Sequence, residues 1–98
     1  MTIEINRSAE KTIIKLAGRL DTTTAPALDK TIGEDIAGTK NLVLDVKELE
    51  YISSAGLRVL LGAQKKMQKI GSMKVINVCE EVMEVFEMTG FADILVIE

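Results

Sequence analysis

Two adjacent serines carry the clearest chemical signal in this chain of 98 residues. An apolar strand pattern ends at Asp45, a charged loop follows, and Ser53 and Ser54 then open a predicted helix. A serine at a helix start can accept backbone N–H groups that lack a helical partner, and such a cap contributes about 1 kcal/mol. The same helix start favours anions, because its free N–H groups and its dipole stabilise negative charge. A phosphate on one of these hydroxyls would be stabilised there and would add about −1.5 to −2 charge to the surface.

The composition excludes several kinds of catalytic site. The chain has no histidine, which removes the Ser-His-Asp relay and an imidazole base near pH 7. It also lacks a Gly-x-x-x-x-Gly-Lys-Ser/Thr phosphate loop, and one cysteine cannot build a four-cysteine zinc site. Cys79 is either a nucleophilic or redox thiol or a small apolar residue packed among neighbouring valines, and we favour the second interpretation. We therefore expect no enzyme activity, no metal and no cofactor.

Charge and hydropathy limit the kinds of partner that the chain can have. The net charge is −3, whereas nonspecific nucleic-acid binding needs a basic stripe. No apolar run approaches the roughly 20 residues of a membrane helix, and the first residues carry no signal-peptide pattern. We expect a cytoplasmic protein without direct nucleic-acid contacts or a membrane span, present as a monomer or weak dimer.

Hydrophobic periodicity predicts one α/β domain over residues 1–98. Ile3 and Ile5 alternate with polar residues, and a short turn leads to a strand over residues 12–20, which indicates an antiparallel hairpin. Residues 42–46, 73–78 and 94–97 read as further strands. The continuous apolar run of residues 42–46 is typical of a parallel strand that is covered on both faces.

Three helices are predicted between these strands. The first begins near Pro26, buries a stripe of Leu28, Ile32 and Ile36 and stops near Gly38, with the Asp21–Thr24 hydroxyls as candidate caps. The second spans residues 54–70, and the third spans residues 80–88. The expected buried stripe of the second helix is Gly56, Leu57, Val59, Leu60, Ala63, Met67 and Ile70.

The element order β-β-α-β-α-β-α-β predicts a mixed, mostly parallel sheet with helices packed on it. Functional groups in such sheets gather at the carboxyl ends of strands, where helices begin. Two segments qualify by this criterion, namely residues 21–24 and residues 45–54.

The chain resembles the STAS-domain anti-sigma factor antagonists over nearly its whole length. The resemblance is strongest at residues 51–57, Tyr-Ile-Ser-Ser-Ala-Gly-Leu, with support from Gly-Arg-Leu-Asp at residues 18–21. The family pattern often reads Asp-Ser-Ser-Gly-Leu or Asp-Ser-Ala-Gly-Leu, and the match implies that Ser54 is the phosphorylated serine. Two positions depart from the pattern, because Ser53 replaces the common Asp and Arg58 stands where Gly is frequent.

The resemblance implies a partner-switching module. The unphosphorylated protein would bind an anti-sigma factor with a serine kinase fold and so release a sigma factor. The kinase would use ATP to phosphorylate Ser54, after which the proteins separate, and a serine phosphatase would reset the switch. The implied partner surface consists of Asp21, Thr22, Thr23, Ser53, Ala55, Gly56, Leu57 and Arg58, and Asp45 would support the phosphorylated loop.

Each of these residues also has a structural interpretation. Ser53 and Ser54 can cap the helix, the threonines can cap the preceding one, and Asp45 can accept loop N–H groups. Gly56 allows close backbone approach by the sheet or by a partner, and Leu57 fits the core on periodicity. Arg58 either pairs with a phosphate or lies in the solvated basic stripe of Lys65, Lys66 and Lys69.

Three function classes are compared, and the resemblance implies the first two of them. The first is the antagonist switched at Ser54. The second is a constitutive adaptor or scaffold subunit, for example of a lipid-transport complex, and the missing Asp before Ser54 motivates it. The third, an enzyme or nucleotide-binding protein, has no supporting motif.

Overall fold

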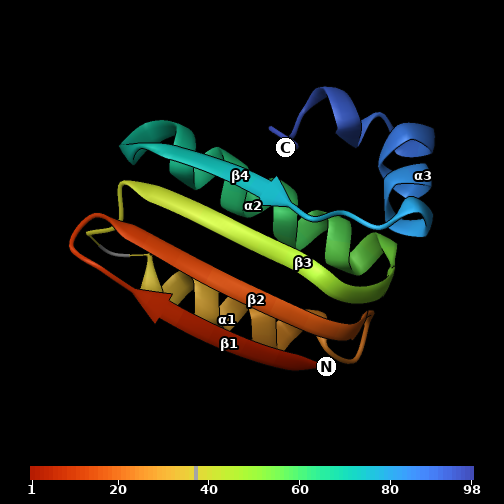
Figure 1. Ribbon diagram of the computed structural model, residues 1–98, viewed down its shortest axis with the longest axis horizontal. Helices are drawn as coiled ribbons and strands as arrows, with labels where there is room; N and C mark the ends of the chain where they lie inside the picture. The colour runs from red at the N-terminus through yellow and green to blue at the C-terminus, as the bar shows by residue number, and fades with distance from the viewer. Residues whose placement is uncertain (37) are drawn as a thin grey trace.

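An antiparallel hairpin begins the fold, as the alternating pattern predicts (Figure 1). The computed structural model describes residues 1–36 and 38–98. Its elements in chain order are β1 (Thr2–Arg7), β2 (Lys11–Leu20), α1 (Ala25–Asp35), β3 (Asn41–Ile52), α2 (Ser54–Ile70), β4 (Ser72–Ile76), α3 (Glu80–Thr89) and the 3-10 helix η1 (Phe91–Asp93).

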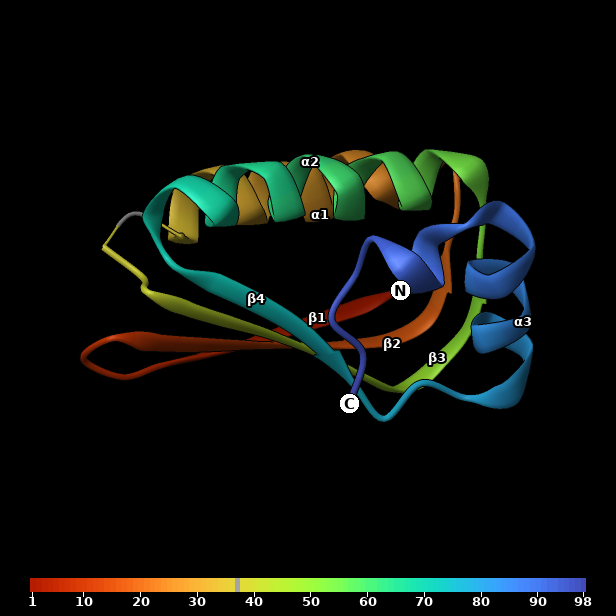
Figure 2. The same ribbon diagram turned by 90° about the horizontal axis from the view of Figure 1, so that it is seen from above.

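The sheet has the order β1-β2-β3-β4, with β1 antiparallel to β2 and the other two pairs parallel. Figure 2 shows α1 and α2 side by side on one face of the sheet, with α3 at the end where β3 terminates. The predicted mixed, mostly parallel α/β fold is therefore confirmed, and all three predicted helices form close to their expected bounds.

The core lies between the sheet and its two covering helices. The predicted α1 stripe of Leu28, Ile32 and Ile36 is buried there, as is Phe86 of α3. The stripe of α2 differs at three positions: Ile70 is 49% exposed, Val59 is only partly buried, and Gln64, which was not predicted, is buried. Gln64 belongs to the i, i+3, i+4 series of Leu60, Ala63 and Met67, so the helical spacing buries it despite its polarity.

The charged segment after Asp45 is a strand, and the prediction of a loop there is wrong. β3 continues to Ile52, with Leu44, Val46, Leu49 and Ile52 facing the core. The inward residues are two apart from Leu44 to Val46 but three apart from Val46 to Leu49 and from Leu49 to Ile52. The wider spacing arises because β3 carries one extra residue at each of two irregularities in its pairing with β2. These bulges restore each apolar residue to the inner face, and they break the period-2 alternation by which a strand is normally found.

The predicted strand over residues 94–97 does not form. Gly90 takes a left-handed conformation (φ 83°) and ends α3, and η1 follows directly. The chain then reaches the edge of β4 at one bridge between Val75 and Ile97. The Val75 N–H donates to the Val96 carbonyl over 2.8 Å, and the Glu98 N–H donates to the Val75 carbonyl over 3.0 Å.

Candidate functional site

The carboxyl ends of β2 and β3 bring two predicted site segments together. Leu20 and Ile52 are paired at the ends of these strands, and the Ser53 N–H donates to the Leu20 carbonyl over 2.8 Å. The turn of residues 21–24 therefore lies beside the start of α2. Parallel strands end at one edge of the sheet, which is why segments about thirty residues apart in sequence meet there.

Asp21 organises the turn before α1. Its Oδ1 accepts the N–H groups of Thr23 over 3.0 Å and Thr24 over 3.1 Å. Several hydrogen bonds lower the pKa of Asp21, and the one donated by the Thr24 backbone N–H has the largest effect. The positive charge of Arg19 lowers this pKa further. Thr22 and Thr23 are exposed beside this carboxylate.

The predicted capping of α1 by threonine hydroxyls is wrong. The N-cap residue Thr24 makes no side-chain cap bond. Its hydroxyl instead accepts the Asp21 N–H over 2.8 Å and donates to the Arg19 carbonyl over 2.8 Å. The side chain therefore ties the turn back to β2 rather than satisfying the helix start.

The two serines have different environments. Ser53 is the N-cap of α2, and its hydroxyl accepts the Gly56 N–H over 3.4 Å. Ser54 is the first residue of the helix and is exposed, and within residues 1–36 and 38–98 its hydroxyl makes no hydrogen bond. The capping task thus falls on Ser53, which leaves the Ser54 hydroxyl accessible. Arg58 is exposed one helical turn further on, on the same face as Ser54.

Gly56 and Leu57 lie beneath this surface rather than on it. Leu57 is only 6% exposed and belongs to the core. A Cβ on Gly56 would lie 2.7 Å from Leu20 Cγ, so the glycine lets α2 approach the sheet. Their assignment as direct partner contacts is therefore corrected: both hold the helix start in place. Ala55, which lies between Ser54 and Gly56 in sequence, is half-buried.

Asp45 lies away from the serines. It sits seven residues before the end of β3, roughly 20 Å along the strand. Its Oδ1 accepts the Lys47 N–H over 3.1 Å and an Asn77 side-chain N–H over 3.0 Å. The expectation that it supports the loop before Ser54 is wrong, because that segment is a strand, and the structural alternative of accepting N–H groups describes its contacts.

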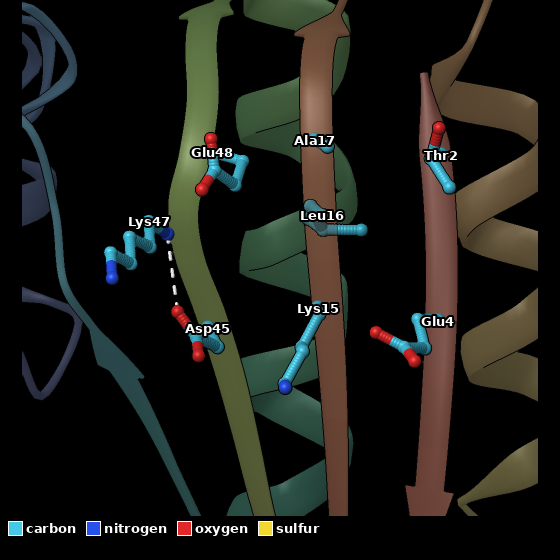
Figure 3. Close-up of a pocket in the computed structure, with 8 residues that line it drawn as sticks. All are labelled: Thr2, Glu4, Lys15, Leu16, Ala17, Asp45, Lys47 and Glu48. Carbon is cyan, nitrogen blue, oxygen red and sulfur yellow. Dashed lines mark hydrogen bonds between the residues drawn. The ribbon is translucent and has the colours of Figure 1, made fainter.

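The sheet face opposite α1 and α2 carries a shallow hollow of about 290 Å³ (Figure 3). Figure 3 shows Glu4, Lys15 and Asp45 projecting from three neighbouring strands into it. The hollow contains neither serine, so it is separate from the site described above. The full lining is Thr2, Glu4, Lys15, Leu16, Ala17, Asp45, Lys47 and Glu48.

Two residues of the site were quoted in the sequence motifs without a role. Arg19 and Tyr51 are opposite each other at the ends of β2 and β3, and the guanidinium carbon lies 4.1 Å from the centre of the tyrosine ring. Sequence separation hides this pair, because only the strand register places the two residues together. Cys79 is half-buried against the core, and its thiol donates to the Leu49 carbonyl over 3.4 Å.

Comparison with known proteins decides the family. The model of the STAS domain matches residues 1–98. The chain belongs to the STAS domain family. Among the residues described, no helix of this STAS domain is long and apolar enough to cross a membrane.

Relatives of this STAS domain include named regulators. It is 28% identical over 96 residues to the anti-sigma-B factor antagonist of Bacillus subtilis, covering 97% of this chain and 88% of that protein. It is 31% identical, over an alignment of 102 positions, to the anti-sigma-B factor antagonist of Listeria monocytogenes, covering 100% of this chain and 89% of that protein. The crystal structure of an anti-sigma factor antagonist from Mycobacterium paratuberculosis superposes with a TM-score of 0.88 at 25% identity, covering 98% and 83%.

Proposed function

We propose that this STAS domain is an anti-sigma factor antagonist whose binding to an anti-sigma factor serine kinase is switched off by phosphorylation of Ser54. The observation that carries the proposal is that the two serines at the start of α2 have different roles. Ser53 caps the helix, and Ser54 presents an exposed hydroxyl in the first turn. The relatives named above supply the class of partner.

Phosphate at Ser54 would be electrostatically favourable within the protein. The N-terminus of the seventeen-residue helix α2 attracts anions, and Arg58 is an exposed cation one turn away. The first turn of α2 contains no acidic residue that would repel the phosphate. Phosphorylation would therefore leave the fold intact and act through the surface.

The partner would experience the modification as a change of charge. Phosphorylation adds about −1.5 to −2 charge at the centre of the proposed contact surface. A loss of only about 2.8 kcal/mol weakens binding a hundredfold. The unphosphorylated form would hold the anti-sigma factor and free the sigma factor, the phosphorylated form would release it, and a phosphatase would reset the cycle. The domain acts as a substrate and binding protein, with the catalysis supplied by its partners.

Phosphorylation by the cognate kinase tests the proposal. Incubation with that kinase and ATP should add one phosphate, which peptide mass spectrometry should locate at Ser54. Ser54→Ala should abolish the modification, and the matched Ser53→Ala variant should keep it. Phosphate on another residue, or none with a kinase that is active on a reference substrate, would overturn the switch.

A binding measurement separates the switch from a constitutive adaptor. Ser54→Asp places a carboxylate at a helix start that tolerates it, so the variant should fold normally. We expect its affinity for the kinase to fall at least tenfold in calorimetry. Unchanged affinity, together with co-purification with a transporter ATPase, would favour the adaptor function.

A further inference from the structure

The paired Arg19 and Tyr51 form an exposed platform next to the proposed switch. The guanidinium lies over the ring at 4.1 Å, within the range of a cation–π contact. Both residues remain accessible, with 61% of the Arg19 side chain and 40% of Tyr51 exposed. Exposed pairs of this kind contribute little to folding stability. Folding stability therefore does not explain why the two residues are paired.

The turn of residues 21–24 holds the platform in position. The Thr24 hydroxyl donates to the Arg19 carbonyl over 2.8 Å, which fixes the backbone below the side chain. Asp21 Oδ2 lies 3.9 Å from Arg19 Nε, which orients the guanidinium without a hydrogen bond. Among the described residues, these contacts leave the terminal N–H donors of Arg19 available. A side chain ordered before binding loses less entropy when a partner docks.

The platform lies near the start of α2, because Tyr51 is three residues before Ser54 and three residues span at most about 11 Å. Arg19 and Tyr51 each precede a residue of the pair that ends the two strands, and the Ser53 N–H is bonded to the Leu20 carbonyl. A partner that covers the start of α2 is therefore in position to contact the platform as well. Arginine and tyrosine are enriched in the residues that dominate protein interfaces.

We infer that Arg19, positioned on the Tyr51 ring, is an anchor for a carboxylate side chain on the anti-sigma factor kinase. This inference rests on the proposed function, and it adds a contact outside the Ser54 motif. A guanidinium presents a planar pair of donors that matches a carboxylate, and the ring beneath it shields one face from water. Tyr51 is a positioning residue in this arrangement, since it acts through the orientation of Arg19.

Calorimetry with the unphosphorylated chain and its cognate kinase tests the anchor. Arg19→Ala should weaken binding about thirtyfold, the loss expected for an interface hot spot. The matched control is Lys11→Ala, which removes one exposed positive charge from the other end of the same strand and should leave affinity unchanged. Arg19→Lys should also bind weakly, because an ammonium lacks the planar fork.

The ring has its own pair of variants. Tyr51→Phe keeps the surface under the guanidinium and should bind as the wild type does, whereas Tyr51→Ala should approach the affinity of Arg19→Ala. Thermal melts should show that all these variants fold, because the pair is exposed. As a second readout, Arg19→Ala should raise KM for phosphorylation of Ser54 and leave kcat unchanged.

The outcomes distinguish this inference from the function on which it rests. A wild-type chain that binds no anti-sigma factor kinase would overturn the proposed function. Wild-type binding with equal affinity of Arg19→Ala and Lys11→Ala would overturn the anchor alone. An equal loss of affinity in Tyr51→Phe and Tyr51→Ala would refute the positioning role of the ring.

Discussion

Replacing Gly56 with alanine should destabilise the domain, although alanine is the better helix former. The added Cβ would lie 2.7 Å from Leu20 Cγ and 2.9 Å from Ile52 Cγ1. Both side chains are buried in the core, so they have little room to move. Overpacking of this kind costs about 1–3 kcal/mol. Helix propensity returns up to about 1 kcal/mol, so we expect a net loss of up to about 2 kcal/mol.

Gly62 provides the matched control in the same helix. A Cβ at this position would meet nothing within 4 Å, so Gly62→Ala should gain the propensity term without the clash. The expected gain is about 0.5–1 kcal/mol. The two variants should therefore differ by about 1–3 kcal/mol, and each kcal/mol corresponds to about 4–8 °C in Tm for a domain of this size.

Urea unfolding followed by circular dichroism, together with thermal melts, measures both variants. An unchanged m-value would show that the denatured state is comparable and that the midpoints report stability. Equal stabilisation by Gly56→Ala and Gly62→Ala would refute the argument that close contact between α2 and the sheet requires glycine at the helix start.

Three further perturbations probe neighbouring features. Gly71→Ala should cost about 2–4 kcal/mol in urea unfolding, because the new Cβ would overlap the Lys40 backbone carbonyl, and wild-type stability would contradict that contact. Ser53→Ala should lower stability by about 0.5–1 kcal/mol, since it leaves the Gly56 N–H without its cap, and an unchanged melt would show that the bond is unimportant. The lowered pKa of Asp21 means that its ionised form stabilises the fold above the unfolded pKa of about 4 and that this contribution is lost as the pH falls through the folded pKa. Asp21→Asn should therefore be less stable than the wild type at pH 7, and the difference should shrink in melts as the pH falls below the unfolded pKa and through the lowered folded pKa; a difference that stays constant over this acid range would refute the ionisation argument.

Local pattern was sufficient for the helices and for the position of the serine motif. The stripe of Leu28, Ile32 and Ile36 and the start of α2 at Ser54 follow from spacing that depends on the helical period alone. The same approach failed from Asp45 to Ile52. There the inward residues are spaced by the two bulges, which exist only in relation to the neighbouring strand.

The prediction of a strand over residues 94–97 from the hydrophobic pattern was also wrong. Residues 94–97 have strand-like composition, yet a strand requires an edge that lies within reach over several residues. The left-handed Gly90 and the turn of η1 bring this segment to β4 at a single bridge. The path of α3 and of the turn that follows it therefore decides how much of residues 94–97 can pair with β4.

The sequence by itself determined the α/β class, the hairpin, the three helices and a helix start carrying two serines, because these depend on residues close together in the chain. Only the tertiary structure decided that Ser53 is the cap, that Ser54 is exposed and that Asp45 lies far from the serines. It also paired Arg19 with Tyr51 and placed both beside the start of α2. These outcomes depend on strand register and on how closely α2 packs against the sheet, and both are set by contacts between residues far apart in sequence.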